Sequence, residues 1–119
     1  MNRKLLISGI FLILIFLGCK EPLTPEEALK TGYSLIGQKE FAKAKVQFKN
    51  AYRADSSNSY ALERLGFCEF KLSNNKKALE LLNFTLKIDS TNSLAYSTRA
   101  QIKFSLQDFY GSLIDCNNA

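Results

Sequence analysis

The sequence contains no histidine and no tryptophan, and its 119 residues include only two prolines and six glycines. Without histidine, the chain lacks the commonest general base and the commonest metal ligand. The scarcity of proline and glycine favours helices over a turn-rich β architecture. Neither a glycine-rich phosphate loop nor a metal-ligand spacing is present. We therefore expect no enzymatic activity, no metal and no cofactor.

Charge is missing from residues 5–18, which read LLISGIFLILIFLG and follow Arg3 and Lys4. As a helix, the stretch from Leu5 to Cys19 would extend about 22 Å, less than the roughly 30 Å of a bilayer core. A basic start, an apolar run of this length and a small residue before a break point are typical of a secretory signal peptide. The sequence predicts such a peptide over residues 1–18, with a short uncleaved membrane anchor as the alternative.

The end of the apolar run, Phe16-Leu17-Gly18-Cys19, resembles the lipobox of bacterial lipoproteins. Gly18 and Cys19 fit that motif, whereas Phe16 departs from its usual leucine. The resemblance implies cleavage before Cys19 and acyl chains, such as palmitate, on this cysteine. One acyl chain holds a protein to a membrane only marginally, but two or three would make the attachment lasting. We expect residues 19–24 to be a lipidated tether and the protein to lie in a bacterial cell envelope. The periplasmic face and the cell surface are both alternatives for its location.

The remaining charge and cysteines give weaker signals. After removal of Arg3 and Lys4, 14 basic residues face 11 acidic ones, an excess too small to indicate nucleic-acid binding. Lys45, Lys49 and Arg53 recur every four residues and share one helix face, which is either simply solvated or attracted to anionic lipid headgroups. Cys68 and Cys116 have no CxxC spacing. We expect both to pack inward as small hydrophobes, with a disulfide as the alternative.

A 34-residue period organises residues 25–119. Copies span 25–58, 59–92 and 93–119, the last incomplete, giving about 2.8 repeats. Each copy predicts two helices, because apolar residues recur at intervals of three and four, and no segment alternates with a period of two. The predicted helices cover residues 26–37, 41–54, 60–72, 76–88, 94–106 and 109 to the end. Residues 55–59 (DSSNS) and 89–93 (DSTNS) offer side-chain oxygens that can cap the helix after each string.

This array resembles tetratricopeptide repeats (TPRs), and the resemblance covers about residues 25–119. It implies an all-α solenoid of helix-turn-helix units, in which small residues let paired helices approach closely. Ser56 and Ser90 stand where the family usually has proline. The positions expected to pack the repeats are Gly32, Ala44, Phe48, Ala51, Gly66, Ala78 and Ala100.

The resemblance also implies a concave groove, lined by the first helix of each copy, that binds a peptide or a partner helix. The expected lining is aromatic and apolar, and consists of Leu29, Tyr33, Ile36, Tyr60, Glu63, Phe67, Phe70, Lys71, Leu94, Gln101 and Phe104. The alternative is that several of these residues pack between neighbouring helices. Chaperone-binding members of this family hold the C-terminal carboxylate of a partner in a clamp of side chains, and we do not expect this clamp here. The matching positions hold Leu29, Tyr33, Arg64, Leu94 and Thr98, of which only Arg64 suits that role.

The third copy is incomplete, so we expect its apolar face, with Leu113 and Ile114, to be partly open. Three alternatives would account for an open face. The chain is a piece of a longer repeat protein, it forms an end-to-end dimer, or a partner covers that face. The sequence thus predicts a membrane-tethered module that binds proteins. The alternative is a structural subunit, or a truncated piece, of a larger envelope assembly that associates through this face.

Overall fold

The computed structural model describes residues 21–119, and the predicted signal peptide and Cys19 lie outside this range. Within it the chain forms six helices and no strand, which confirms the predicted all-α TPR-like solenoid. The helix bounds agree with the sequence prediction to within one residue at most ends. The helices are α2 (Pro25–Gly37), α3 (Phe41–Ala54), α4 (Ser59–Lys71), α5 (Asn75–Ile88), α6 (Ser93–Ser105) and α7 (Phe109–Asn118).

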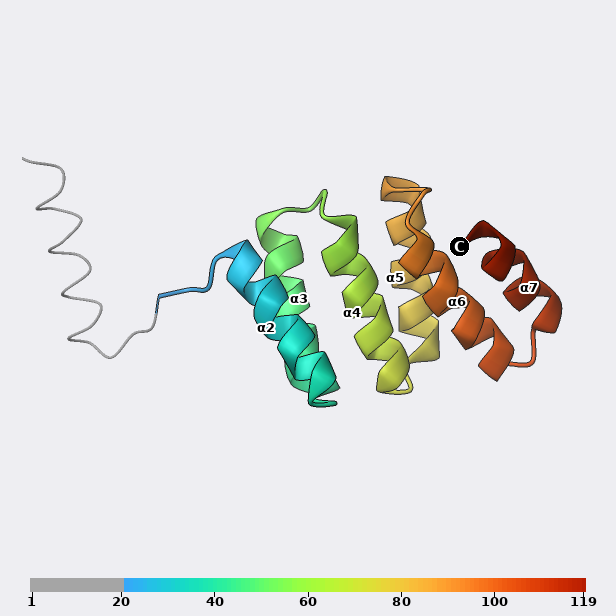
Figure 1. The fold of residues 1–119 in the computed structure, drawn as a ribbon, viewed down its shortest axis with the longest axis horizontal. Helices are drawn as coiled ribbons and strands as arrows, with labels where there is room; N and C mark the ends of the chain where they lie inside the picture. The colour runs from blue at the N-terminus through green and yellow to red at the C-terminus, as the bar shows by residue number, and fades with distance from the viewer. Residues whose placement is uncertain (1–20) are drawn as a thin grey trace, which may run out of the picture.

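The helices pack as three hairpins, α2 with α3, α4 with α5 and α6 with α7. Successive hairpins stack because α3 contacts α4 and α5 contacts α6. Figure 1 shows α2, α4 and α6 on the near side of the array, with α3 and α5 behind them. The first helices of the copies therefore form one layer, and α4 and α6 touch directly within it. None of the helices in residues 21–119 has the length and hydropathy needed to span a bilayer.

Asparagine caps the first helix of the second and third copies. Asn58 Oδ1 accepts a hydrogen bond from the backbone N–H of Ala61 at 3.1 Å, and Asn92 Oδ1 accepts one from Ala95 at 3.0 Å. These bonds satisfy donors that the start of a helix leaves without an intrahelical partner. The first copy uses Thr24 instead, in a reciprocal capping box with Glu27.

The turn inside each hairpin has a residue with left-handed backbone at the same repeat position. Lys39, Ser73 and Gln107 have φ values of 59°, 66° and 65° and lie 34 residues apart. This conformation strains any residue with a Cβ atom and suits glycine. All three copies therefore share one turn geometry, although none has a glycine at the left-handed position.

Glycine permits the close approach of paired helices in the first two copies. A Cβ atom on Gly32 would lie 2.8 Å from the ring of Phe48, and one on Gly66 would lie 3.1 Å from Leu82. Phe48 and Leu82 are fully buried. Ala100 is the equivalent small residue of the third copy and is also buried. The other small packing positions, Ala44, Ala51 and Ala78, are fully buried as well.

The two cysteines of the described region differ in their environment. Cys68 is buried in the core between the first two copies, and burial raises the pKa of its thiol to about 12. Cys116 is exposed, and both thiols are free. The prediction that Cys116 packs inward is therefore wrong. Its repeat equivalents Phe48 and Leu82 are covered by a helix of the next copy, whereas within residues 21–119 no helix follows α7.

Candidate functional site

The predicted groove residues lie on the layer formed by α2, α4 and α6, but their side chains differ in accessibility. Tyr60 and Phe104 are 58% and 63% exposed, and Tyr33, Lys71, Leu94 and Gln101 are exposed too. Leu29 and Ile36 are half-buried against the core between the first two copies. Phe70 is half-buried against the core between the second and third copies. Packing between helices, the alternative that the sequence left open, thus describes Leu29, Ile36 and Phe70.

Cations lie over aromatic rings at the centre of this layer. The guanidinium carbon of Arg64 is 4.5 Å from the ring centroid of Phe67. The Lys71 ammonium lies 5.4 Å from the same centroid and 5.5 Å from that of Phe70. Phe41 of α3 meets Phe67 edge-on at 6.3 Å. Such contacts hold the rings in place and leave cationic groups beside apolar surface.

Tyr33 joins α2 to this region. Its ring packs edge-on against the buried ring of Phe48, with centroids 5.4 Å apart, while part of the side chain stays exposed. Burial of the phenol is the largest influence on the pKa of Tyr33 and raises it, although the charge of Arg64 opposes the shift. Tyr33 therefore keeps its hydroxyl proton at neutral pH and can donate a hydrogen bond to a ligand.

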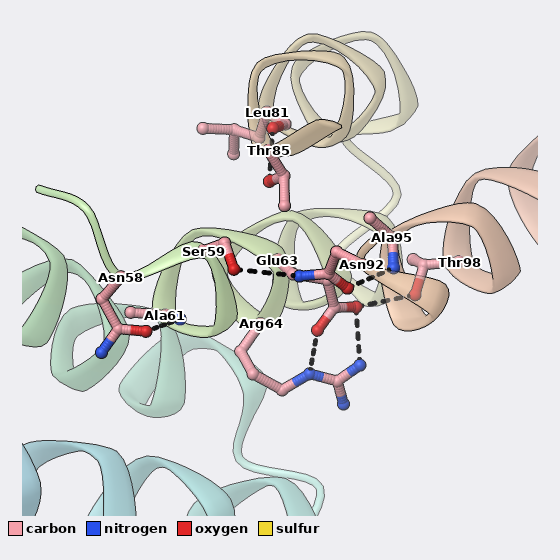
Figure 2. Close-up of polar contacts among 10 residues, drawn as sticks. All are labelled: Asn58, Ser59, Ala61, Glu63, Arg64, Leu81, Thr85, Asn92, Ala95 and Thr98. Carbon is pink, nitrogen blue, oxygen red and sulfur yellow. Dashed lines mark hydrogen bonds and ion pairs between the residues drawn. The ribbon is translucent and has the colours of Figure 1, made fainter. Parts of the chain in front are cut away.

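Glu63 is fully buried, so its assignment to the groove surface is wrong. Its carboxylate accepts a hydrogen bond from Arg64 Nη2 at 2.6 Å and one from the hydroxyl of Thr98 on α6 at 2.9 Å (Figure 2). The physical reason is the direct contact of α4 with α6, which encloses the side chain. Burial alone would lower the pKa of Arg64, but its hydrogen bonds to Glu63 outweigh this and raise it.

A second polar contact joins the same two helices. The side-chain amide of Asn92 donates to the hydroxyl of Ser59 at 3.4 Å, while Thr85 on α5 bonds the carbonyl of Leu81 within its own helix (Figure 2). Together with the bond between Glu63 and Thr98, this contact fixes α4 against α6. The central part of the candidate surface is therefore held by buried polar bonds rather than by apolar packing alone.

Gln101 and Phe104 belong to a separate part of the layer. They line a cavity of about 560 Å³ between α6 and α7, together with Ser112 and Cys116. Phe104 also packs edge-on against Phe109 of α7, with ring centroids 5.3 Å apart. The predicted groove thus resolves into two regions: an aromatic platform of Tyr33, Tyr60, Arg64, Phe67 and Lys71, and the α6–α7 cavity.

Sequence reasoning considered Arg64 only as a clamp residue and did not place it in the groove. The neighbouring Glu63 and Arg64 form a pair that a helix period of 3.6 does not predict, since adjacent residues diverge on a helix surface. Thr98, another clamp position, is buried and bonded to Glu63. No group of three metal-ligating side chains occurs within residues 21–119.

Comparison with solved structures identifies the fold. One similar structure is the first TPR domain of Spaghetti (RPAP3) bound to the HSP90 peptide SRMEEVD. It is 19% identical to this chain with a TM-score of 0.73, and the alignment covers 79% of this chain and 75% of the Spaghetti chain. The TPR domain of Arabidopsis OM64 is 20% identical with a TM-score of 0.72 and covers 76% and 75%, respectively. No protein-family model and no curated protein matches the sequence. Similarity at this identity shows a TPR-like fold.

Proposed function

We propose that this protein is a membrane-tethered, non-enzymatic interaction module that binds a peptide or helix of a protein partner on the α2–α4–α6 layer. The observation that supports this most is the aromatic platform, which combines the exposed side chains of Tyr33 and Tyr60 with Phe67 and its two cations on the same layer of helices. Aromatic side chains bury a large area at a small cost in conformational entropy, which makes them effective anchors for a partner.

The chemistry of the platform favours a partner segment with apolar anchors and an acidic side chain. Within residues 21–119 Lys71 makes no ion pair, so its ammonium is available to a carboxylate beside Phe67 and Phe70. Arg64 is already paired with Glu63 and contributes its flat apolar face more than its charge. The Spaghetti domain, of similar fold, binds an HSP90 peptide. With Thr98 buried, we do not propose a carboxylate clamp here.

A peptide-display selection tests this binding mode. The mature chain, immobilised through its N-terminus, is screened against random linear peptides, and enriched peptides are titrated by fluorescence anisotropy. Tyr60→Ala should weaken binding at least tenfold, because truncation of an anchoring aromatic residue removes more than about 1.4 kcal/mol. Tyr110→Ala on α7 removes an even more exposed tyrosine, 77% against 58% for Tyr60, outside the platform and should leave binding unchanged. No enrichment, or equal losses in both variants, would contradict the proposal.

The tether is supported by the resemblance of residues 16–19 to a lipobox and is tested separately. Cys19→Ala should abolish metabolic labelling with palmitate and leave an unprocessed precursor. Cys116→Ala removes an exposed thiol elsewhere in the chain and should leave labelling intact. Retained labelling of the Cys19→Ala protein would refute the tether without affecting the binding proposal.

A structural role is the second candidate, and the apolar surface of α7 favours it. Phe109, Tyr110, Leu113 and Ile114 are all exposed on this last helix. An exposed apolar patch of this kind often marks an interface with another subunit. Sedimentation equilibrium of the mature chain distinguishes the candidates: a dimer that Leu113→Glu converts to a monomer supports the structural role, and a monomeric wild type argues against it.

A further inference from the structure

A second cavity, of about 270 Å³, lies between α3, α4 and α5 and contains none of the predicted groove residues. Its walls include Leu62 and Leu65 of α4 and Leu81 of α5. Leu62 and Leu65 belong to the buried core, and Leu81 packs against them. The cavity therefore has an apolar interior at the junction of the first two copies.

The rim of this cavity is basic. Lys49 and Arg53 on α3 and Lys77 on α5 line it, and within residues 21–119 none of the three lies within 4.0 Å of a carboxylate. The rim also contains one ion pair, with Lys45 Nζ 3.2 Å from Glu69 Oε1. Glu69 is itself buried and accepts a hydrogen bond from Asn74 at 2.7 Å. Four cationic side chains thus line the cavity together with one carboxylate, which is already bonded to Lys45 and Asn74.

The equivalent position at the next repeat junction shows that a carboxylate of this chain can itself pair with the cations there. Leu65 and Leu81 correspond to Arg99 and Asp115, each 34 residues further on. Asp115 is fully buried, and its oxygens lie 2.6 Å from Arg99 Nη2 and 2.9 Å from Lys103 Nζ. At the second junction, an internal carboxylate therefore binds two cations. At the first junction the three equivalent positions hold Leu65, Glu69 and Leu81, so this internal ion network is absent, and the cations at the rim come from other repeat positions, on α3 and α5.

We propose that the cavity at the first junction binds an acyl chain carrying an anionic group, a carboxylate or a phosphate. The apolar chain would enter among Leu62, Leu65 and Leu81, and the anion would be held by Lys49, Arg53 and Lys77. A volume near 270 Å³ is slightly below the roughly 300–1,000 Å³ of most ligand cavities, so it accommodates the part of a chain nearest the head group rather than a whole lipid. Charge-assisted hydrogen bonds to the anion supply specificity, and apolar burial supplies affinity.

The head group has two possible sources, a free fatty acid or an anionic phospholipid, and both share this chemistry. The experiment uses the full chain in the membranes of expressing cells. Three photoreactive probes carry the same diazirine acyl chain: a fatty acid, a phosphatidic acid and a neutral monoacylglycerol. After irradiation, labelled peptides are mapped by mass spectrometry. We expect labelling between residues 59 and 71 by the fatty acid, by the phosphatidic acid or by both, which identifies the source, and much less by the neutral probe.

Matched variants test the role of the rim. Arg53→Gln should reduce labelling of the 59–71 segment about tenfold, since it removes one charge-assisted contact to the anion. Lys87→Gln alters the equivalent residue one repeat later, which lies outside the cavity lining, and should have no effect. Leu81→Asp places a negative charge among the apolar walls of the cavity and should abolish labelling, because it repels the anion and disrupts the site for the acyl chain. If this substitution of a half-buried residue prevents folding, the exposed Arg53→Gln variant still decides.

Equal labelling by the neutral probe, labelling unaffected by Arg53→Gln, or no labelling of the 59–71 segment would each overturn the proposal. None of these results bears on peptide binding at the α2–α4–α6 layer, because the cavity contains no residue of the aromatic platform.

Discussion

The two junctions between repeat copies occupy the same place in the 34-residue unit but are closed by different chemistry. The first is lined mainly by apolar side chains, among them Phe48, Leu62 and Leu65. The second combines a smaller apolar cluster around Leu82 and Ile102 with the buried carboxylate of Asp115 and its two cations. A repeat backbone can therefore be kept while equivalent positions change between leucine and charged residues. The backbone depends on the caps and the small residues, which both junctions share.

The position occupied by Phe48, Leu82 and Cys116 gives the largest expected difference between copies. Phe48→Ala should lower the free energy of unfolding by about 3–5 kcal/mol and Leu82→Ala by about 2–5 kcal/mol, because both leave buried cavities. Cys116→Ala, at an exposed position, should change it by less than about 0.5 kcal/mol. Urea unfolding of residues 21–119, followed by circular dichroism, measures all three. Equal losses would mean that α7 is covered like its counterparts.

The ion network at the second junction should make a smaller, pH-dependent contribution. Burial alone would raise the pKa of Asp115, but hydrogen bonds from Arg99 and Lys103 outweigh it and lower that pKa. Since the pKa is depressed on folding, the stabilisation is fully present above the unfolded value of about 3.9 and is lost as the pH falls through the folded value. Asp115→Asn should therefore cost about 2 kcal/mol at pH 7 and progressively less below pH 4.

Urea unfolding from pH 7 to pH 2.5 measures the difference between this variant and the wild type. Glu80→Gln serves as the control, because Glu80 is exposed and makes no ion pair within residues 21–119. If Asp115→Asn lowers the free energy of unfolding by the same amount at every pH, the network stabilises the fold through packing rather than through charge.

The turn inside each hairpin, which the copies share, should give the smallest effect. Ser73→Gly relieves a left-handed backbone at φ 66° and should stabilise the protein by about 0.5 kcal/mol, after the entropy of the unfolded glycine is counted. Ser34→Gly, inside helix α2, should instead destabilise it by roughly 0.5–1 kcal/mol. Thermal unfolding of both variants gives the signs, and a loss of stability in Ser73→Gly would show that the serine side chain makes a needed contact.

The helix bounds and the stacking were predictable because periodicity, caps and the 34-residue repeat agree with one another. Asn58 and Asn92, recognisable as caps in the sequence, do cap α4 and α6. The burial of Glu63 was not predictable, because it depends on Arg64 and on Thr98, which lies a full repeat away. The basic cavity was equally hidden. Lys49 and Arg53 are visible as a helix face, but Lys77 and the leucine walls come from two other helices.

The central claim, that a partner docks on the α2–α4–α6 layer of a tethered chain, is tested most directly by photo-crosslinking in native membranes. A photoreactive amino acid replaces Tyr60 on this layer or, as control, Val46 on α3, which is 52% exposed. We predict that one protein other than this chain is captured from position 60 and not from position 46. Capture of the same species from both positions, or of this chain alone, would contradict the claim.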